Sequence, residues 1–200
     1  ACRKAALGRL SGGIPGFGLR RMFIDHESNR RTVLESGVQA DPGRGHIVLV
    51  PGPPKEVEAV RRMFHLYVNE NLAPGTIART LNRDGIRNGF GRRWNSSGIR
   101  YVLQNERYTG TLIYNRRSGR LRSAQKLNPE DQWIRIPMAF PAIVSRRLYE
   151  AAQKQAAARR QRHNEASLLN LLRHVRDRHQ RLSVKLLRAE TERNYYPAYR

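Results

Sequence analysis

Proline and glycine residues divide the middle of this 200-residue chain into three short segments with helical periodicity. Apolar residues recur every three or four positions after Pro53–Pro54, after Pro74–Gly75 and after Asn95. Proline is tolerated in the first turn of a helix, and Gly85 suits the left-handed position just beyond the end of one. The three helices expected from this pattern begin near positions 54, 74 and 96 and end near 71, 85 and 104.

The apolar residues of these segments are expected to face a common core, because they fall on one side of each helix. Trp94, just ahead of the third segment, is expected to anchor this core rather than to stack on a ligand. Tyr101 and Tyr108 could serve either purpose. The predicted inward-facing residues are Val57, Val60, Phe64, Tyr67, Ile77, Ala78, Leu81, Ile99, Val102 and Leu103.

Strand-like stretches lie on both sides of the helical segments. The first fifty residues predict a small antiparallel β element, with strands within 11–25, 30–37 and 47–50. Residues 111–117 and 132–144 predict two more strands, the second interrupted by prolines. The last part of the chain is expected to be helical: Ser145 caps a helix running toward Arg162, and further helical stretches follow at 167–175 and 183–190. The expected fold is α+β and mainly helical, with a helix-turn-helix-like core, a small antiparallel β element and a helical C-terminal arm.

The charge of the chain is strongly basic. Thirty-eight Lys and Arg against 16 Asp and Glu give a net charge of +22 and a sequence pI near 11.5. Residues 75–126 hold a net +10 and residues 154–200 a net +8, so the excess lies in two segments. Such an excess indicates a polyanionic partner: DNA, RNA or an anionic membrane surface. Arginine dominates it, and the guanidinium fork suits phosphates and base edges.

The composition also argues against several classes. Hydrophobic residues make up 39% of the chain, which fits a folded protein. No apolar run approaches the ~18 residues of a membrane helix, so no membrane partner is expected. The single cysteine, Cys2, excludes a disulfide framework and a cysteine zinc site within the chain, and no metal or cofactor is expected. Because Ala1 is not a natural start, the chain is expected to be a fragment or a processed product.

The third predicted helix carries a polar face opposite its buried stripe, with residues at the spacing i, i+3, i+4, i+7. Such side chains can bond phosphates and base edges, and the N-terminus of the helix is itself a phosphate site. Further arginines precede the helix, end the strand that follows it and lie in the first predicted strand. The residues predicted to contact DNA are Arg20, Arg21, Arg92, Arg93, Ser96, Ser97, Arg100, Tyr101, Gln104, Arg116 and Arg117.

Two observations leave this interpretation open. A polar helix face with one arginine is often no more than a solvated surface. The loop between the second and third helices spans about ten residues, longer than in a tight helix-turn-helix unit.

Five stretches occur in order between residues 10 and 153, within a match that runs over roughly residues 7–155: LSGGIPGFGLRR, VPGPPKEVEAVRRMFHLYV, IARTLNRDGI, GRRWNSSGIRYVLQNERYTGTLIYN and AIVSRRLYEAAQ. Together they resemble the recombinase domain of large serine recombinases, which include phage-type integrases and transposon-type resolvases. The combination is specific: an LN-x-x-GI end to one helix, G-x-x-W before the next, and N-x-x-Y-x-G before a strand.

The resemblance implies a role in DNA recombination. In that family an N-terminal catalytic domain carries a serine that attacks DNA and forms a 5′-phosphoserine link, and a long helix joins it to the recombinase domain, which binds half of the attachment site. Residues 1–10 resemble the end of that joining helix, but the catalytic domain is absent, so no residue here inherits the nucleophile role. The cysteines of the family's zinc ribbon are also missing, and residues 165–200 resemble a small helical DNA-binding repeat instead. Phe17 stands where the family usually has tyrosine.

The expected function is therefore sequence-specific binding of duplex DNA at recombination sites. A DNA-binding domain is expected over 1–155 and a basic helical appendage over 156–200. The chain alone should not cut DNA, self-association is expected only through the missing catalytic domain, and the expected setting is DNA-associated, in a bacterial or phage-infected cytoplasm. Two alternatives stay open: a stand-alone DNA-binding regulator and a basic RNA-binding protein.

Overall fold

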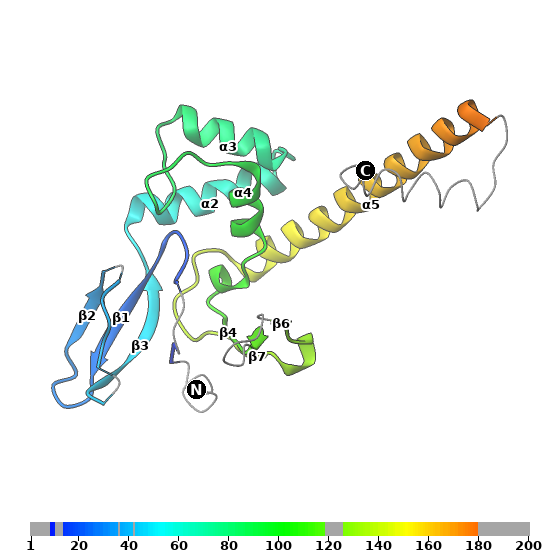
Figure 1. The fold of residues 1–200 in the computed structure, drawn as a ribbon. Helices are drawn as coiled ribbons and strands as arrows, with labels where there is room; N and C mark the ends of the chain where they lie inside the picture. Colours follow the sequence, from blue (N-terminus) through cyan, green and yellow to red (C-terminus); the bar gives the residue numbers. More distant parts are fainter. Residues whose placement is uncertain (1–8, 11–13, 36, 42, 119–125, 180–200) are drawn as a thin grey trace, which may run out of the picture. The chain divides into compact units, whose positions relative to one another are not determined.

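The computed structural model describes residues 9–10, 14–35, 37–41, 43–118 and 126–179. It separates into two compact units, Ala1–Gln153 and Lys154–Arg200. The expected mixture of helices and small antiparallel sheets is confirmed (Figure 1). The helix expected over 183–190, and Ser183 as its cap, lie outside the described residues.

The first unit begins with a three-stranded antiparallel sheet in the order β2-β1-β3 (Figure 1). Its strands are β1 (Leu19–Asp25), β2 (Arg31–Leu34) and β3 (Gly45–Pro51), which confirms the β element expected in the first fifty residues. The sheet is tied to the helices at its upper end in Figure 1, where the Gly18 amide donates to the Glu56 carboxylate at 3.0 Å.

Three helices follow, as the sequence predicts: α2 (Pro54–Val68), α3 (Pro74–Arg83) and α4 (Ser96–Leu103). Proline opens both α2 and α3. The Asn95 side chain caps α4 by accepting from the Gly98 amide at 2.7 Å. Gly85, with φ of +75°, takes the left-handed conformation just after α3. All ten predicted inward-facing residues of these helices are buried.

Aromatic side chains fill the space between sheet and helices. Tyr108 is fully buried, and its hydroxyl donates to the Phe17 carbonyl at 2.8 Å, so it belongs to the core. Its ring packs edge-on against Phe64, and the Phe17 ring packs edge-on against Trp94 with centroids 5.0 Å apart. The expectation that Trp94 anchors the core is confirmed, because its side chain is 7% exposed. Phe17 thus contacts two residues of this core: its carbonyl accepts from Tyr108, and its ring packs on Trp94.

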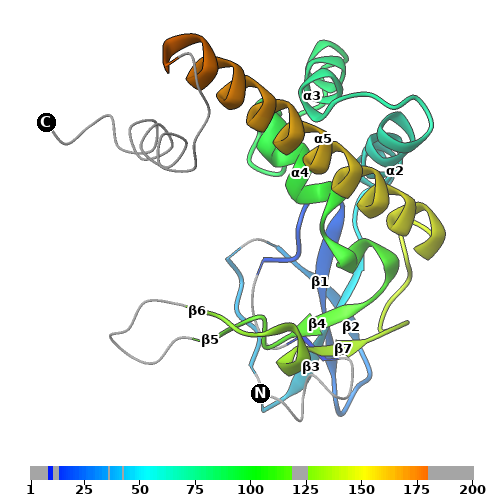
Figure 2. The same cartoon turned by 90° about the vertical axis from the view of Figure 1, so that its right-hand side faces the viewer.

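The segment after α4 is more broken than the sequence predicts. A 3-10 turn, η1 (Glu106–Thr109), leads into β4 (Leu112–Tyr114), which pairs with β7 (Ile134–Ile136). The predicted single strand over 111–117 is interrupted because Asn115 adopts φ of +62°, and β5 (Arg117–Ser118) then pairs with β6 (Lys126–Leu127). Figure 2 shows β5 and β6 as a narrow ribbon beyond β4.

The predicted strand over 132–144 shrinks to the three residues of β7. It is preceded by a second 3-10 turn, η2 (Glu130–Gln132), and stops at Pro137, which has no N–H to give to a ladder. Met138 then turns the chain with φ of +53°.

The last described helix is α5 (Arg146–His179), which crosses the boundary between the two units. Ser145 caps it as predicted, its hydroxyl accepting from the Leu148 amide at 3.3 Å. The expected end near Arg162 is wrong, because the helix continues through the second predicted stretch at 167–175. No proline or glycine occurs within the helix, so nothing in the backbone interrupts it.

Candidate nucleic-acid interface

The structure places the four residues predicted on the outer face of α4 together at the surface. Ser97, Arg100, Tyr101 and Gln104 are all exposed, and Tyr101 is 65% exposed. The opposite face of the helix is buried. A Tyr ring, a guanidinium, a hydroxyl and an amide on two turns of helix form a surface that can both hydrogen-bond and stack.

A side-chain clamp fixes the start of α4 on α3. The Asn82 amide group donates to the Trp94 carbonyl at 2.8 Å, and its oxygen accepts from the Trp94 amide at 2.8 Å. Asn82 lies near the end of α3, and Trp94 lies two residues before α4. The clamp therefore sets where the outer face of α4 begins, although 12 residues separate the two partners.

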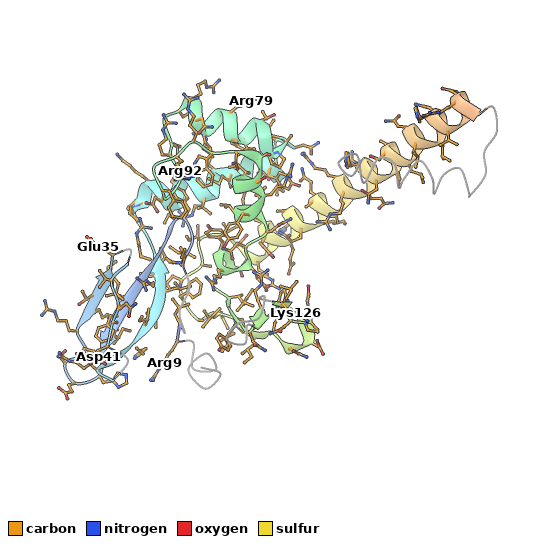
Figure 3. All side chains as sticks on the ribbon, in the orientation of Figure 1. Arg9, Glu35, Asp41, Arg79, Arg92 and Lys126 are labelled. Atoms are coloured by element: carbon orange, nitrogen blue, oxygen red, sulfur yellow. The ribbon has the colours of Figure 1, made fainter. Side chains whose placement is uncertain are left out.

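The loop between α3 and α4 presents arginines. Arg92 and Arg93 are exposed, and neither has a carboxylate partner among the residues that the structure describes. In Figure 3 Arg92 lies beside the helical cluster, whereas Asp41 lies at the far end of the three-stranded sheet. Ser96, also predicted to contact DNA, is half-buried in the first turn of α4.

The two predicted arginines of β1 are differently placed. Arg20 forms a two-pronged ion pair with Glu56 of α2, with nitrogen–oxygen distances of 2.6 and 2.9 Å. Arg21 donates to the carbonyls of Glu35 and Val38 at 3.2 and 2.9 Å. The positive charge of Arg20 is therefore balanced by the Glu56 carboxylate. Arg21 donates hydrogen bonds to neutral carbonyls, so its positive charge is not balanced by these contacts.

A groove of about 920 Å³ lies between the sheet, the loop before α4 and the edge of α4 that carries Gly98, Tyr101 and Val102. It is largely apolar for a surface of so basic a chain. Arg20, Arg21 and Tyr101 all border it, so the structure brings one predicted residue of α4 to the same groove as the two predicted arginines of β1. The large hydrophobic side chains exposed along it are those of Ile14, Val38, Phe90 and Tyr101.

Of the two arginines predicted after β4, Arg116 lies against an aromatic ring, that of Trp133. The Arg116 guanidinium lies 4.7 Å from the centre of the Trp133 ring, and the Arg135 guanidinium lies 4.9 Å from it. Arg135 also pairs with Glu106 and Glu130. The Trp133 ring holds the Arg116 guanidinium in place. Arg116 has no carboxylate partner among the described residues, so its positive charge is not balanced there. Arg117 begins β5.

Several of these relationships carry only a faint sequence signal. The LN-x-x-GI pattern contains Asn82 and the G-x-x-W pattern contains Trp94, but neither pattern indicates that the two residues are in contact. Trp133 and Phe90 were not predicted as site residues. The sequence signal that indicates Phe90 is an aromatic residue between two glycines with arginines close by on both sides.

Within the described ranges, no three His, Cys, Asp or Glu side chains gather as metal ligands. No helix in the part of the chain that the structure describes has the length and apolarity needed to cross a membrane.

A family model described as Recombinase matches residues 54–159, more than half of the chain. The chain belongs to the recombinase family. The matched residues include α2, α3, α4 and the residues around Trp133. The resemblance inferred from the sequence motifs is confirmed at the level of the recombinase domain.

The other comparisons add less. No curated protein sequence matches this chain. A solved structure named "Crystal Structure of a LSR-DNA Complex" matches with a TM-score of 0.45 and 11% identity. The match covers 78% of this chain and 36% of that one, so the chain spans about a third of that protein's length.

Proposed function

We propose that this chain is the DNA-binding portion of a large serine site-specific recombinase. The observation that carries the proposal is the outer face of α4, where Ser97, Arg100, Tyr101 and Gln104 are exposed together on a helix of a recombinase-family domain. An α-helix fits the major groove of B-DNA, and these residue types bond base edges and phosphates. Under this proposal, α4 reads the bases.

The arginines around α4 hold the DNA backbone. Arg92 and Arg93 lie ahead of the helix, whose N-terminus favours phosphate, and Arg116 stands with its charge unbalanced at Trp133. Arg117 and the half-buried Ser96 belong to the same proposed set. Arg21 keeps an unbalanced charge, whereas Arg20 is already paired with Glu56 and contributes less to DNA binding.

The helical appendage gives a second contact further along the site. Residues 154–200 hold a net charge of +8, which suits a polyanion. We place the domain boundary near residue 155, so that 1–155 binds the core of the half-site and 156–200 its outer part. The protein acts at DNA, and the parent enzyme supplies the catalytic serine and the contacts for self-association.

Two other functions fit the same charge. A stand-alone DNA-binding regulator would use α4 in the same way, and an open reading frame that continues upstream into a catalytic domain would separate the two. An RNA-binding protein would prefer RNA over duplex DNA in direct competition. The experiment that tests the proposal is selection of bound sequences from a random duplex pool with an RNA competitor present: a recovered consensus supports it, and preference for the RNA contradicts it.

A further inference from the structure

Phe90 is an apolar ring left in water at the tip of a loop. The residue is 77% exposed, and it stands between Gly89 and Gly91 ahead of α4. A large hydrophobic side chain normally gains free energy by burial, so an aromatic residue held out from the surface by small neighbours suggests a partner.

The turn that carries Phe90 is well ordered by hydrogen bonds. The Asn88 side-chain oxygen accepts from the amides of Phe90 and Arg92 at 2.9 and 3.0 Å. The Asn88 amide donates to the Arg92 carbonyl at 2.9 Å, and the Gly91 amide donates to the Asn88 carbonyl at 2.9 Å. Gly91 takes φ of +72°, which closes the turn. The ring is therefore presented on a fixed support, which lowers the entropy lost when it binds.

The surroundings of Phe90 select the partner. Arg87, Arg92 and Arg93 are exposed within three residues of it along the chain. On its other side the ring borders the groove that also contains Tyr101 of the proposed recognition helix. An apolar protein segment would gain nothing from three arginines, whereas duplex DNA offers phosphates to the arginines and base faces to the ring.

We propose that Phe90 is a wedge that inserts between bases of the bound DNA and unstacks one base step. Apolar side chains that enter a base step in this way distort the duplex locally and widen the contact with the protein. The inference rests on the proposed function, since it needs DNA bound at α4. It adds a base-contacting residue outside the helix and a local distortion of the DNA.

The test uses the full chain and a duplex that it selects from a random pool. 2-Aminopurine, whose fluorescence rises when it is unstacked, is placed at one position of the duplex at a time. The wild-type chain should raise the fluorescence at one base step. Phe90→Ala should abolish that rise and weaken binding about ten-fold or more, as for the loss of one base–aromatic contact. Phe90→Leu, which keeps an apolar wedge, should retain part of the rise.

Met138→Ala serves as the matched control, because Met138 is 90% exposed and lies outside this loop. It should change neither binding nor fluorescence. A wild-type complex with no fluorescence rise at any position overturns the wedge while leaving the proposed function intact, and so does a Phe90→Ala complex that matches the wild type. A drop in melting temperature of Phe90→Ala with unchanged DNA binding also overturns it, because the ring would then be structural. If no duplex binds the wild-type chain, the proposed function fails first, and the wedge with it.

Discussion

Asn82 of α3 holds both backbone hydrogen-bonding groups of Trp94 with its side-chain amide, at 2.8 Å in each direction. The Trp94 ring, which is buried, packs edge-on against the half-buried Phe17. The start of α4 is thus fixed twice, by its backbone to a neighbouring helix and by its ring to the core. If α4 is the recognition helix that we propose, it needs such a support, because its side chains must meet base edges in a set geometry.

Removal of this clamp should destabilise the domain. Asn82→Ala leaves the part-buried amide and carbonyl of Trp94 without partners, and we expect the free energy of unfolding to fall by about 2–3 kcal/mol. Urea unfolding followed by tryptophan fluorescence measures this. Asn69→Ala is the control, since Asn69 is exposed and its side chain bonds only the nearby His65 among the described residues; its effect should stay within about 0.5 kcal/mol. Equal effects of the two variants would contradict the clamp.

Tyr108 should make the fold sensitive to alkaline pH. Burial raises the pKa of the Tyr108 hydroxyl above its ordinary value of 10, because the phenolate cannot be solvated there. The unfolded chain ionises this tyrosine above about pH 10, so the stability tied to its neutral form is complete below that pH and declines above it. Tyr108→Phe should cost about 1–2 kcal/mol at neutral pH, through loss of the bond to Phe17, and should reduce the decline above pH 10.

The check is urea unfolding at neutral pH and above pH 10. Tyr149→Phe is the comparison, because burial also raises the pKa of Tyr149, but that side chain is less buried and its bond to the Gln104 carbonyl is longer, at 3.2 Å. The wild type and Tyr108→Phe should converge as the pH rises. Parallel curves would mean that Tyr108 is not the group responsible.

Arg92 and Arg20 should differ in how they affect the salt dependence of DNA binding. Arg92 is exposed and carries an unbalanced charge among the described residues, whereas Arg20 is paired with Glu56. Arg92→Ala should lower the slope of log affinity against log salt by about 0.9 and weaken all sequences alike. Arg20→Ala should leave the slope nearly unchanged and lower stability by roughly 1 kcal/mol. Titrations at several salt concentrations separate the two, and a similar loss of slope for both would show that Arg20 also meets a phosphate.

Trp133 should act on DNA through Arg116. Trp133→Ala removes the ring on which the Arg116 guanidinium rests, so the arginine must be ordered during binding. We expect DNA affinity to fall about as far as in Arg116→Ala. The double variant should fall little further, because the two residues act as a unit. Additive losses in this double-mutant cycle would show that Arg116 binds phosphate without help from Trp133.

Local patterns predicted the helices and the small β element well. Pro54 and Pro74 favour helix starts through their fixed backbone angle, and Asn95 does so through its side-chain cap, so the starts of α2, α3 and α4 are visible in the sequence. The long α5 was predicted in pieces because its polar stretch after Arg162 has no apolar periodicity. A helix without glycine or proline needs no such periodicity to continue.

The candidate site was harder to predict, because it depends on contacts between distant residues. Arg20 resembles a free DNA-binding arginine in the sequence, and its partner Glu56 lies 36 residues further along the chain. The contact between Arg116 and Trp133 exists because β4 pairs with β7 across a turn-rich segment. Neither relationship has a local signature. The outer face of α4, in contrast, follows from helical spacing alone, and its exposure agrees with that expectation.

The central claim is that α4 reads base sequence, and one comparison tests it most directly. Sequences are selected from a random duplex pool in parallel by the wild-type chain and by Arg100→Ala, and both chains are then titrated on the wild-type consensus. We predict a defined consensus for the wild type, a loss of preference at one position for the variant, and a cost of roughly 1–3 kcal/mol on that consensus. An Arg100→Ala chain that selects the same consensus with the same affinity would contradict the assignment of α4 as the recognition helix.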